Sequence, residues 1–348
     1  MKKQGSNRKK LRVVMLADES LLPNGDLTDF SAKQRELRKT EFDVRDAIEQ
    51  LGHDLIPIGV SDDLSTIRGA IDAHKPDIVF NLVEEFAGIG HFDQHVVSYL
   101  ELCKQPYTGC NPRGLTLARD KALTKKILAY HGLKVPEFAI FPQKRAVRRP
   151  DDLAFPLFVK SLTEEGSVGI SSASVVHDDD KLKERVDYIH RTTNSIAVAE
   201  QFIEGREIYV GVMGNSRVTA LPAWELEMTK KNDDAPLVAT DRAKWDPEYQ
   251  QQVGLRTGPA KITSKMQADL AALSKKIYRL LGMSGYARLD YRLTEAGEAY
   301  LLEANPNPQI AKDEDFALSA GHAKLSYPEL IDRLIRFGVQ YEPDRILA

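Results

Sequence analysis

The sequence predicts an α/β domain followed by an α+β region, and the order of its apolar segments carries this prediction. In the first third of the 348-residue chain, continuous apolar runs alternate with helical stretches, as in an open parallel sheet covered by helices. The middle of the chain instead holds many short apolar segments with few helices between them, which is typical of an α+β fold. A β-prone hairpin at residues 286–305 follows near the C-terminal end.

The first domain is predicted to span residues 1–112. It begins with a frayed basic tail at 1–10, which is followed by no apolar core of a signal peptide. A segment rich in turn residues, 105–114, closes the domain. Strands are expected at 11–17, 54–60 and 77–83, and helices at 33–51 and 92–104.

The second region opens with a basic helix, which we predict at 113–132. Residues 226–262 are polar and carry few strand signals. Because long structureless loops are usually functional or disordered, we predict a mobile loop there. Further helices are expected near 178–191, 263–281 and 327–337. Strands are expected at 138–141, 155–161, 170–176, 196–203, 207–214 and 218–228.

The composition excludes several classes of protein. Apolar residues make up 42% and charged residues 28% of the chain, as in an ordinary globular protein. A net charge of −3 argues against a nucleic-acid partner. No apolar run approaches the roughly 20 residues of a membrane helix. The two cysteines, Cys103 and Cys110, indicate neither a disulfide framework nor a zinc site, so a reducing, cytoplasmic location is expected.

The hairpin at 286–305 predicts a metal site. With a two-residue tip at 296–297, Asp290 faces Glu303 and Arg288 faces Asn305, and all four side chains project from one face. Directly opposed carboxylates repel each other. Oxygen ligands of this kind suit Mg²⁺ that shares its shell with phosphate oxygens. The alternative is an exposed hairpin whose carboxylates are neutralised by arginines, namely Arg288 and Arg292.

Two further segments suggest a nucleotide site. Lys160 ends a predicted strand and precedes a Gly/Ser loop at 166–169, whose amides and hydroxyl could face phosphate oxygens. An ordinary hairpin is the alternative there. At 198–211, the short link between two predicted strands could read an adenine edge and sandwich the ring between apolar residues. Glu207 in this segment could accept hydrogen bonds from ribose hydroxyls.

These motifs together identify a family resemblance. The chain resembles the ATP-grasp carboxylate–amine ligases, and among them the D-alanine–D-alanine ligases most closely. This resemblance implies that an α/β domain precedes an α+β ATP-grasp fold, whose subdomains 113–203 and 204–348 grip ATP. It rests on QPYTGCNPRGLTLARDKALTKKILAYHGLKVP, FVKSLTEEGSVGIS, AEQFIEGREIYVGVMGN, RAKWD and GYARLDYRLTEAGEAYLLEANPNP, which occur in the family's order.

The resemblance implies ATP and two Mg²⁺ ions as cofactors, with Mn²⁺ as an alternative metal, and small carboxylate and amine substrates. Arg288 and Lys244 would be catalytic. Asp290, Glu303 and Asn305 would bind the metal ions. Nucleotide binding is implied for Lys121, Lys160, Ser167, Glu200, Phe202, Ile203, Glu207 and Lys244. No nucleic acid or membrane partner is expected, and a homodimer is left open.

The sequence departs from the D-alanine–D-alanine ligases around both substrates. Gln309 stands where a glycine is expected, and Lys312 falls where small or hydroxyl residues belong. Both are therefore predicted substrate-pocket residues. The resulting prediction is an ATP-dependent ligase that joins an amino-acid or peptide carboxylate to an amine through an acyl phosphate. The alternatives are a genuine D-alanine–D-alanine ligase and a non-catalytic ATP-binding regulatory protein.

Overall fold

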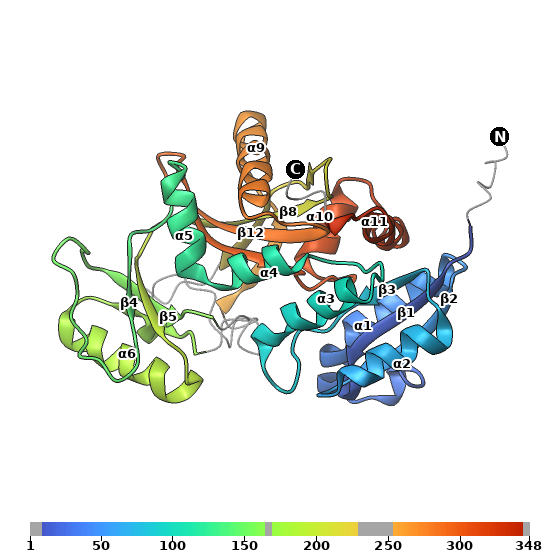
Figure 1. Ribbon diagram of the computed structural model, residues 1–348. Helices are drawn as coiled ribbons and strands as arrows, with labels where there is room; N and C mark the ends of the chain where they lie inside the picture. The colour runs from blue at the N-terminus through green and yellow to red at the C-terminus, as the bar shows by residue number, and fades with distance from the viewer. Residues whose placement is uncertain (1–8, 164–168, 229–252, 344–348) are drawn as a thin grey trace. The chain divides into compact units, whose positions relative to one another are not determined.

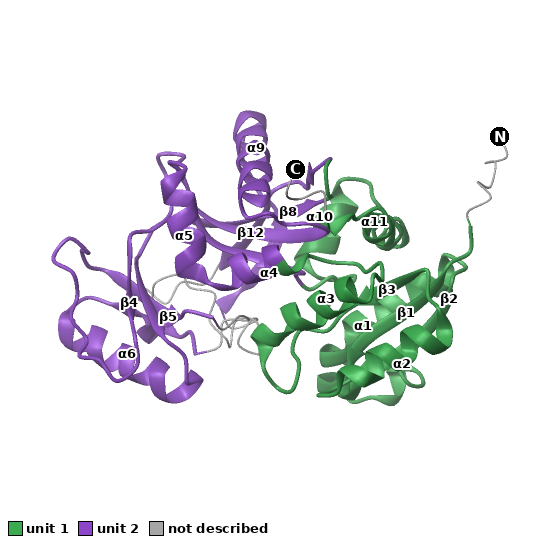
Figure 2. Cartoon of the chain, in the orientation of Figure 1, with its two compact units in different colours: residues 1–112, 214–216, 309–348 green, residues 113–213, 217–308 purple. Residues whose placement is uncertain are grey.

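The computed structural model describes residues 9–163, 169–228 and 253–343. The chain forms two compact units (Figure 2). Unit 1 comprises residues 1–112, 214–216 and 309–348, and unit 2 comprises residues 113–213 and 217–308. This division differs from the three predicted domains, because it groups 309–348 with the N-terminal residues. The subdivision of unit 2 into two parts remains a prediction.

Unit 1 is an α/β unit, as predicted. Its parallel sheet has the strand order β2-β1-β3, with β1 at Arg12–Asp18, β2 at Asp54–Val60 and β3 at Ile78–Asn81. The five central residues of β1 are buried, which explains why this strand reads as a continuous apolar run. The helices are α1 (Ala32–Gln50), α2 (Leu64–His74), α3 (Asp93–Leu102), α10 (Asp315–His322) and α11 (Tyr327–Val339); the short 3-10 helices are Glu19–Leu21, Leu27–Asp29 and Gly90–Phe92.

The last helix packs closely within unit 1. A Cβ atom at Gly338 of α11 would lie 2.3 Å from the carbonyl oxygen of Tyr107. Only glycine therefore allows this approach between the helix and the backbone that follows α3. The preceding helix, α10, was missed in the sequence, because its eight residues show too short an apolar period to be recognised.

Unit 2 contains two sheets (Figure 1). The smaller sheet has the order β4-β7-β5-β6, with strands Phe138–Phe141 (β4), Leu157–Ser161 (β5), Val175–Val176 (β6) and Ala197–Gln201 (β7). Helix α6 (Asp179–Thr193) packs against it through Leu182, Val186 and Ile189. The larger sheet runs β11-β10-β8-β12-β13, with β9 beside β8. Its strands are Arg206–Met213 (β8), Thr219–Ala220 (β9), Trp224–Met228 (β10), Leu255–Pro259 (β11), Tyr286–Leu293 (β12) and Ala299–Pro306 (β13).

The other helices in the described part of unit 2 are α4 (Pro112–Arg119), α5 (Lys121–Tyr130) and α9 (Ser264–Leu280). The prediction of one helix at 113–132 was wrong. Asp120 leaves the helical conformation, and its carboxylate accepts a hydrogen bond from the backbone N–H of Leu123, so that it caps the start of α5.

Two other local predictions need correction. Segment 170–176, predicted as a strand, contains the 3-10 helix Ser172–Ser174 before the two-residue β6. The ends of the predicted mobile loop at 226–262 are ordered, because β10 and β11 pair antiparallel there. The middle of this loop and the tail at 1–8 lie outside the described residues.

The hairpin has the residue pairs predicted for Asp290 and Arg288, but its tip and the register near the tip differ from the prediction. Its tip is not the two residues 296–297: Thr294 donates its N–H to the carbonyl of Glu298, which encloses three residues, and Gly297 has a φ of +79°. This tip shifts the register by one residue. The register then shifts back between Asp290 and Tyr291, where Leu302 on the facing strand is an extra, bulged residue.

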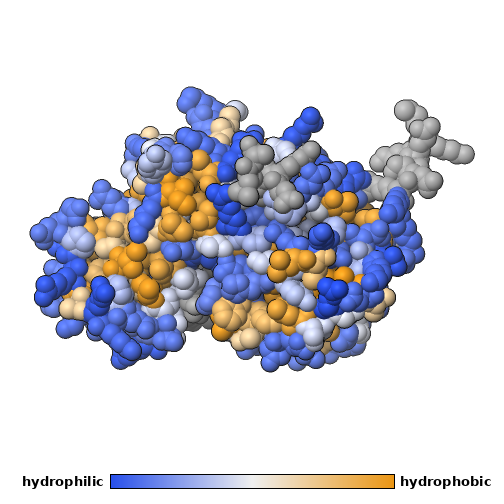
Figure 3. Space-filling model, in the orientation of Figure 1, coloured by the Kyte–Doolittle hydropathy of each residue, from blue (hydrophilic) through white to orange (hydrophobic). Residues whose placement is uncertain are grey.

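No helix in the described ranges could cross a membrane. Figure 3 shows polar and charged residues over much of one face, with apolar patches between them.

Candidate active site

The hairpin of unit 2 carries the predicted metal ligands in the predicted pairs. Asp290 on β12 faces Glu303 on β13, and Arg288 faces Asn305. The Arg288 guanidinium forms a two-point contact with Asp290, with Nε 2.8 Å from Oδ1 and Nη2 2.9 Å from Oδ2. The Asn305 amide lies 2.8 Å from Asp290 Oδ2. Lys121 Nζ is 3.0 Å from Glu303 Oε1.

Each carboxylate of the pair therefore has its own cation, which removes the repulsion expected from the sequence. The alternative prediction was an exposed hairpin neutralised by arginines. Its pairing holds for Arg288 and Asp290, but Asp290 is buried, and the pairing is wrong for Arg292. Arg292 instead contacts Glu207, with Nη2 3.0 Å from Oε2.

The donor set fits a particular kind of metal site. In the described part of the chain, no three His, Cys, Asp or Glu side chains come together as a metal cage. The candidate ligands are instead two carboxylates and one amide, which lie on one face of the two-stranded hairpin. Mg²⁺ is often held by one or two carboxylates while phosphate oxygens and water complete its shell. The residues present fit such a shared site.

A buried ionic cluster adjoins the hairpin. Glu200 on β7 is 2% exposed, and its Oε1 lies 2.8 Å from Lys125 Nζ and 3.3 Å from Lys160 Nζ. Burial raises the pKa of Glu200, but the two ammonium groups outweigh it and hold the pKa below its ordinary value. Burial lowers the pKa of Lys160, but Glu200 and Glu303 outweigh it and raise that pKa.

Lys125 was missed in the sequence. Its spacing from Lys121, four residues along α5, could have indicated it, because residues at i and i+4 share a helix face. Lys125 is 1% exposed, and its Nζ also donates to the carbonyl oxygen of Leu302 at 3.0 Å. Burial lowers the pKa of Lys125 to about 8, against the attraction of Glu200.

Glu207 is hydrogen-bonded to Tyr209, a second residue that was missed in the sequence. The Tyr209 hydroxyl donates to Glu207 Oε1 at 2.7 Å, and the Arg288 guanidinium lies 4.4 Å from the centre of the Tyr209 ring. Arg292 also donates to the carbonyl of Gly205 at 3.1 Å. Both carboxylate oxygens of Glu207 have protein partners, and each retains a lone pair that could accept a ribose hydroxyl.

The remaining nucleotide candidates lie on the link from β7 to β8. Phe202 is half-buried and donates its backbone N–H to the carbonyl of Pro156 at 2.9 Å, while Ile203 is buried.

The ion pairs described above bring Lys121, Lys160, Glu200 and the hairpin residues into one ionic network. Ser167 and Lys244 lie outside the described residues.

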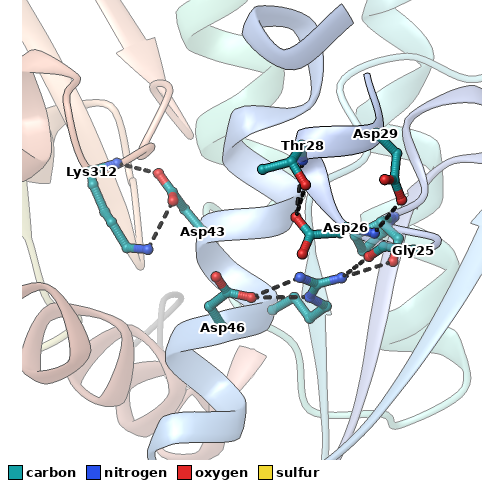
Figure 4. Close-up of polar contacts among 9 residues, drawn as sticks. Gly25, Asp26, Thr28, Asp29, Asp43, Asp46 and Lys312 are labelled. Atoms are coloured by element: carbon teal, nitrogen blue, oxygen red, sulfur yellow. Dashed lines mark hydrogen bonds and ion pairs between the residues drawn. The ribbon is translucent and has the colours of Figure 1, made fainter. Parts of the chain in front are cut away.

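The two predicted substrate-pocket residues belong to unit 1. Gln309 is partly buried. Lys312 is held by α1: its backbone N–H donates to Asp43 Oδ2 at 2.8 Å, and its Nζ lies 2.9 Å from Asp43 Oδ1 (Figure 4). Lys39 of α1 likewise contacts Asp313 at 3.2 Å and Glu314 at 2.6 Å. Lys312 and its two acidic neighbours thus have partners on α1.

The segment that follows β1 is also tied to α1. Arg45 of α1 donates to the carbonyl of Gly25 at 2.9 Å and contacts Asp46. The Asp26 carboxylate accepts from the backbone N–H groups of Thr28 and Asp29, and the Asp29 carboxylate accepts from the N–H of Asp26. Asp26 and Asp29 thereby form a capping box (Figure 4). These contacts give a defined local structure to the segment between β1 and α1.

The fold and this site define an ATP-grasp carboxylate–amine ligase. Residues 127–336 match the family model described as "D-ala D-ala ligase C-terminus", and the chain belongs to this family. It is 33% identical over 295 residues to "Uncharacterized protein y4sG" of Sinorhizobium fredii, covering 83% of this chain and 84% of that protein.

Two other similarities agree with this family. The chain is 29% identical to the D-alanine–D-alanine ligase of Desulforudis audaxviator over 296 residues, covering 83% of this chain and 89% of that protein. The crystal structure of the Bacillus anthracis D-alanine–D-alanine ligase complexed with ATP matches with a TM-score of 0.74 at 20% identity. That match covers 95% of this chain and 98% of the other.

We expect Glu200→Gln to destabilise the protein strongly, because it removes the carboxylate that pairs directly with the two buried ammonium groups of Lys125 and Lys160. Breaking a buried pair typically costs about 3–5 kcal/mol. The pKa of Glu200 is lowered from 4.5 in the folded state, so its stabilisation is complete above this value and disappears as the pH falls through the lower folded pKa. The difference in urea unfolding free energy from wild type should therefore shrink in acid. Glu204→Gln, an exposed neighbour, is the control and should match wild type.

Proposed function

We propose that this protein is an ATP-dependent ligase that joins a small carboxylate to an amine through an acyl phosphate. The observation that supports this most is the hairpin face. It presents two carboxylates and an amide for a divalent cation, and two cations, Lys121 and Arg288, already contact those carboxylates.

The proposed chemistry follows from the weak reactivity of a carboxylate. ATP would supply the phosphoryl group that makes the carboxylate reactive, and Mg²⁺ would neutralise charge on that group. Asp290, Glu303 and Asn305 would hold the metal. Lys121 would exchange its contact with Glu303 for phosphate oxygens, since the metal would take over that carboxylate.

Arg288 would serve the second half of the reaction. With Asp290 among the residues that would hold the metal, the guanidinium would no longer need its two-point contact and would offer fixed donors to the oxyanion that forms when the amine attacks. Its stacking on the Tyr209 ring would limit how far it moves. Lys160 would bind phosphate, while Glu200, Phe202 and Ile203 would hold adenine and Glu207 the ribose.

Two roles rest on the family resemblance alone. Ser167 would cover the phosphates, and Lys244 would reach the γ-phosphate. Both remain predictions. A small-molecule substrate pair and a cytoplasmic location are also proposed. Static light scattering of the purified protein would decide between a monomer and a homodimer.

The amine or carboxylate substrate is proposed to be larger or more polar than D-alanine. The contacts of Lys312 and its acidic neighbours with α1 leave Gln309 as the residue that supports this proposal, because its amide adds bulk where the family has glycine. A genuine D-alanine–D-alanine ligase is the second candidate, supported by relatives that carry this name.

A phosphate-release screen over amino-acid pairs separates these candidates. We expect feeble release with D-alanine alone and at least about tenfold faster release with a polar pair, since a pocket rejects a partner that leaves its polar groups unpaired. Gln309→Gly should raise the rate with D-alanine. Robust D-Ala-D-Ala formation by the wild type at millimolar D-alanine would instead establish the second candidate. ATP binding without turnover on any pair would favour a regulatory role.

A further inference from the structure

Lys125 joins the two sheets of unit 2. Its Nζ lies 2.8 Å from Glu200 Oε1, on β7 of the smaller sheet, and 3.0 Å from the Leu302 carbonyl, on β13 of the larger sheet. The side chain is fully buried. An ammonium group in such a place is costly unless it is paired and hydrogen-bonded, and these two contacts meet that requirement.

The contact with Leu302 falls on the residue that sets the hairpin register. Leu302 is the bulged residue, and without the extra residue Glu303 would not face Asp290. Lys125 is therefore hydrogen-bonded to β13 at the residue that precedes Glu303, the first predicted metal ligand of that strand.

The contact with Glu200 affects a second cation. Glu200 Oε1 is shared between Lys125 and Lys160, and the Lys125 contact is the shorter by 0.5 Å, 2.8 Å against 3.3 Å. Since Lys125 carries much of the interaction with Glu200, the Lys160 ammonium is less strongly held by this carboxylate and can serve a phosphate.

We propose that Lys125 is a positioning residue that fixes Glu200 and the bulged strand β13 relative to each other, so that nucleotide and metal are bound cooperatively. This inference rests on the proposed nucleotide and metal sites, and Lys125 itself touches neither ligand in this proposal. A purely structural role would lower the stability of a Lys125 variant, because removing one partner of a buried ion pair destabilises a protein, but it would leave the coupling between metal and nucleotide unchanged.

The charge on Lys125 gives the proposal a signature in pH. Glu200 of β7, Lys160 of β5 and Glu303 of β13 act electrostatically on this ammonium, and burial lowers its pKa to about 8. Above that pH, Lys125 loses its attraction to Glu200 and keeps only its ability to donate to Leu302. Cooperation between metal and nucleotide should weaken over the same range.

The test is the affinity for ADP measured by calorimetry with Mg²⁺ and with EDTA, and the ratio of the two affinities is the metal increment. Lys125→Met should reduce this increment about fivefold or more, within the usual range of coupling between two bound ligands. Lys126→Met, which changes an exposed lysine on the same helix, should leave it unchanged. The wild-type increment should fall from about pH 7 to about pH 9, while that of Lys125→Met stays flat.

An increment equal to wild type in folded Lys125→Met would overturn the proposal, as would a lower melting temperature with no change in the increment. If Lys125→Met does not fold, Lys125→Gln and the wild-type pH series give the same decision. The assay needs no ligation substrate. A wild type that shows the increment but forms no amide would therefore contradict the proposed reaction and leave the role of Lys125 standing. A wild type without any increment would overturn this inference.

Discussion

Asp290→Asn and Glu303→Gln are each expected to lower Mg²⁺-dependent ATP turnover at least about 100-fold. A metal ion contributes several kcal/mol to phosphoryl transfer, and each 1.36 kcal/mol is a tenfold change in rate. Each substitution removes one of the two anionic ligands of the proposed site. Turnover is measured by phosphate release across a range of Mg²⁺ concentrations, where the variants should also need more metal.

Glu298→Gln is a matched control, because Glu298 lies near the tip of the same hairpin and pairs with Lys134 at the surface. This variant should keep wild-type turnover. Full activity in Asp290→Asn or Glu303→Gln would exclude the metal assignment.

The thermal stability of these variants depends on the cations seen in the structure. If the two opposed carboxylates had no other partners, removing one would relieve their repulsion and hold or raise the apo melting temperature. Asp290 instead pairs with Arg288, and Glu303 pairs with Lys121, which is itself buried. Since each substitution weakens one of these ion pairs, the apo melting temperature is expected to fall modestly. Differential scanning calorimetry without metal measures this change.

Arg288→Ala is expected to lower turnover about 100- to 1,000-fold, the usual effect of removing a donor to a developing oxyanion. The same substitution frees Asp290 from its two-point contact. The affinity for Mg²⁺ should therefore be unchanged or higher, in contrast to the carboxylate variants. Turnover by phosphate release and Mg²⁺ affinity by calorimetry together distinguish the two kinds of residue.

Arg288→Lys should recover little of the lost turnover, because an ammonium cannot reproduce the planar two-point geometry of the guanidinium. Arg279→Ala, at an exposed position of α9, should behave as wild type. If Arg288→Ala weakened Mg²⁺ binding as much as it slowed turnover, the arginine would act through the metal site and not on the oxyanion.

Much of the fold could be predicted from the sequence, because it depends on local periodicity. The buried run of β1 and the long amphipathic period of α9 were each recognisable from neighbouring residues alone. The pairs Asp290–Glu303 and Arg288–Asn305 were also predicted correctly, but only because two errors cancelled. A three-residue tip moved the register by one, and the bulge at Leu302 moved it back. Neither event leaves a clear signal in the order of residues.

The sequence by itself determined the chemical groups that the chain can offer. One carboxylate lies two residues from an arginine, the other lies two residues from an amide, and lysines lie near glycine-rich segments. These motifs also determined the family. Only the tertiary structure decided how those charges are paired. In the folded chain, Lys125 contacts both β7 and β13, Lys121 forms an ion pair with Glu303, and Lys312 forms an ion pair with α1. The physical reason is that local preferences are set by adjacent residues. The partner of a buried charge is instead set by contacts between segments far apart in the chain, such as Lys125 and Leu302.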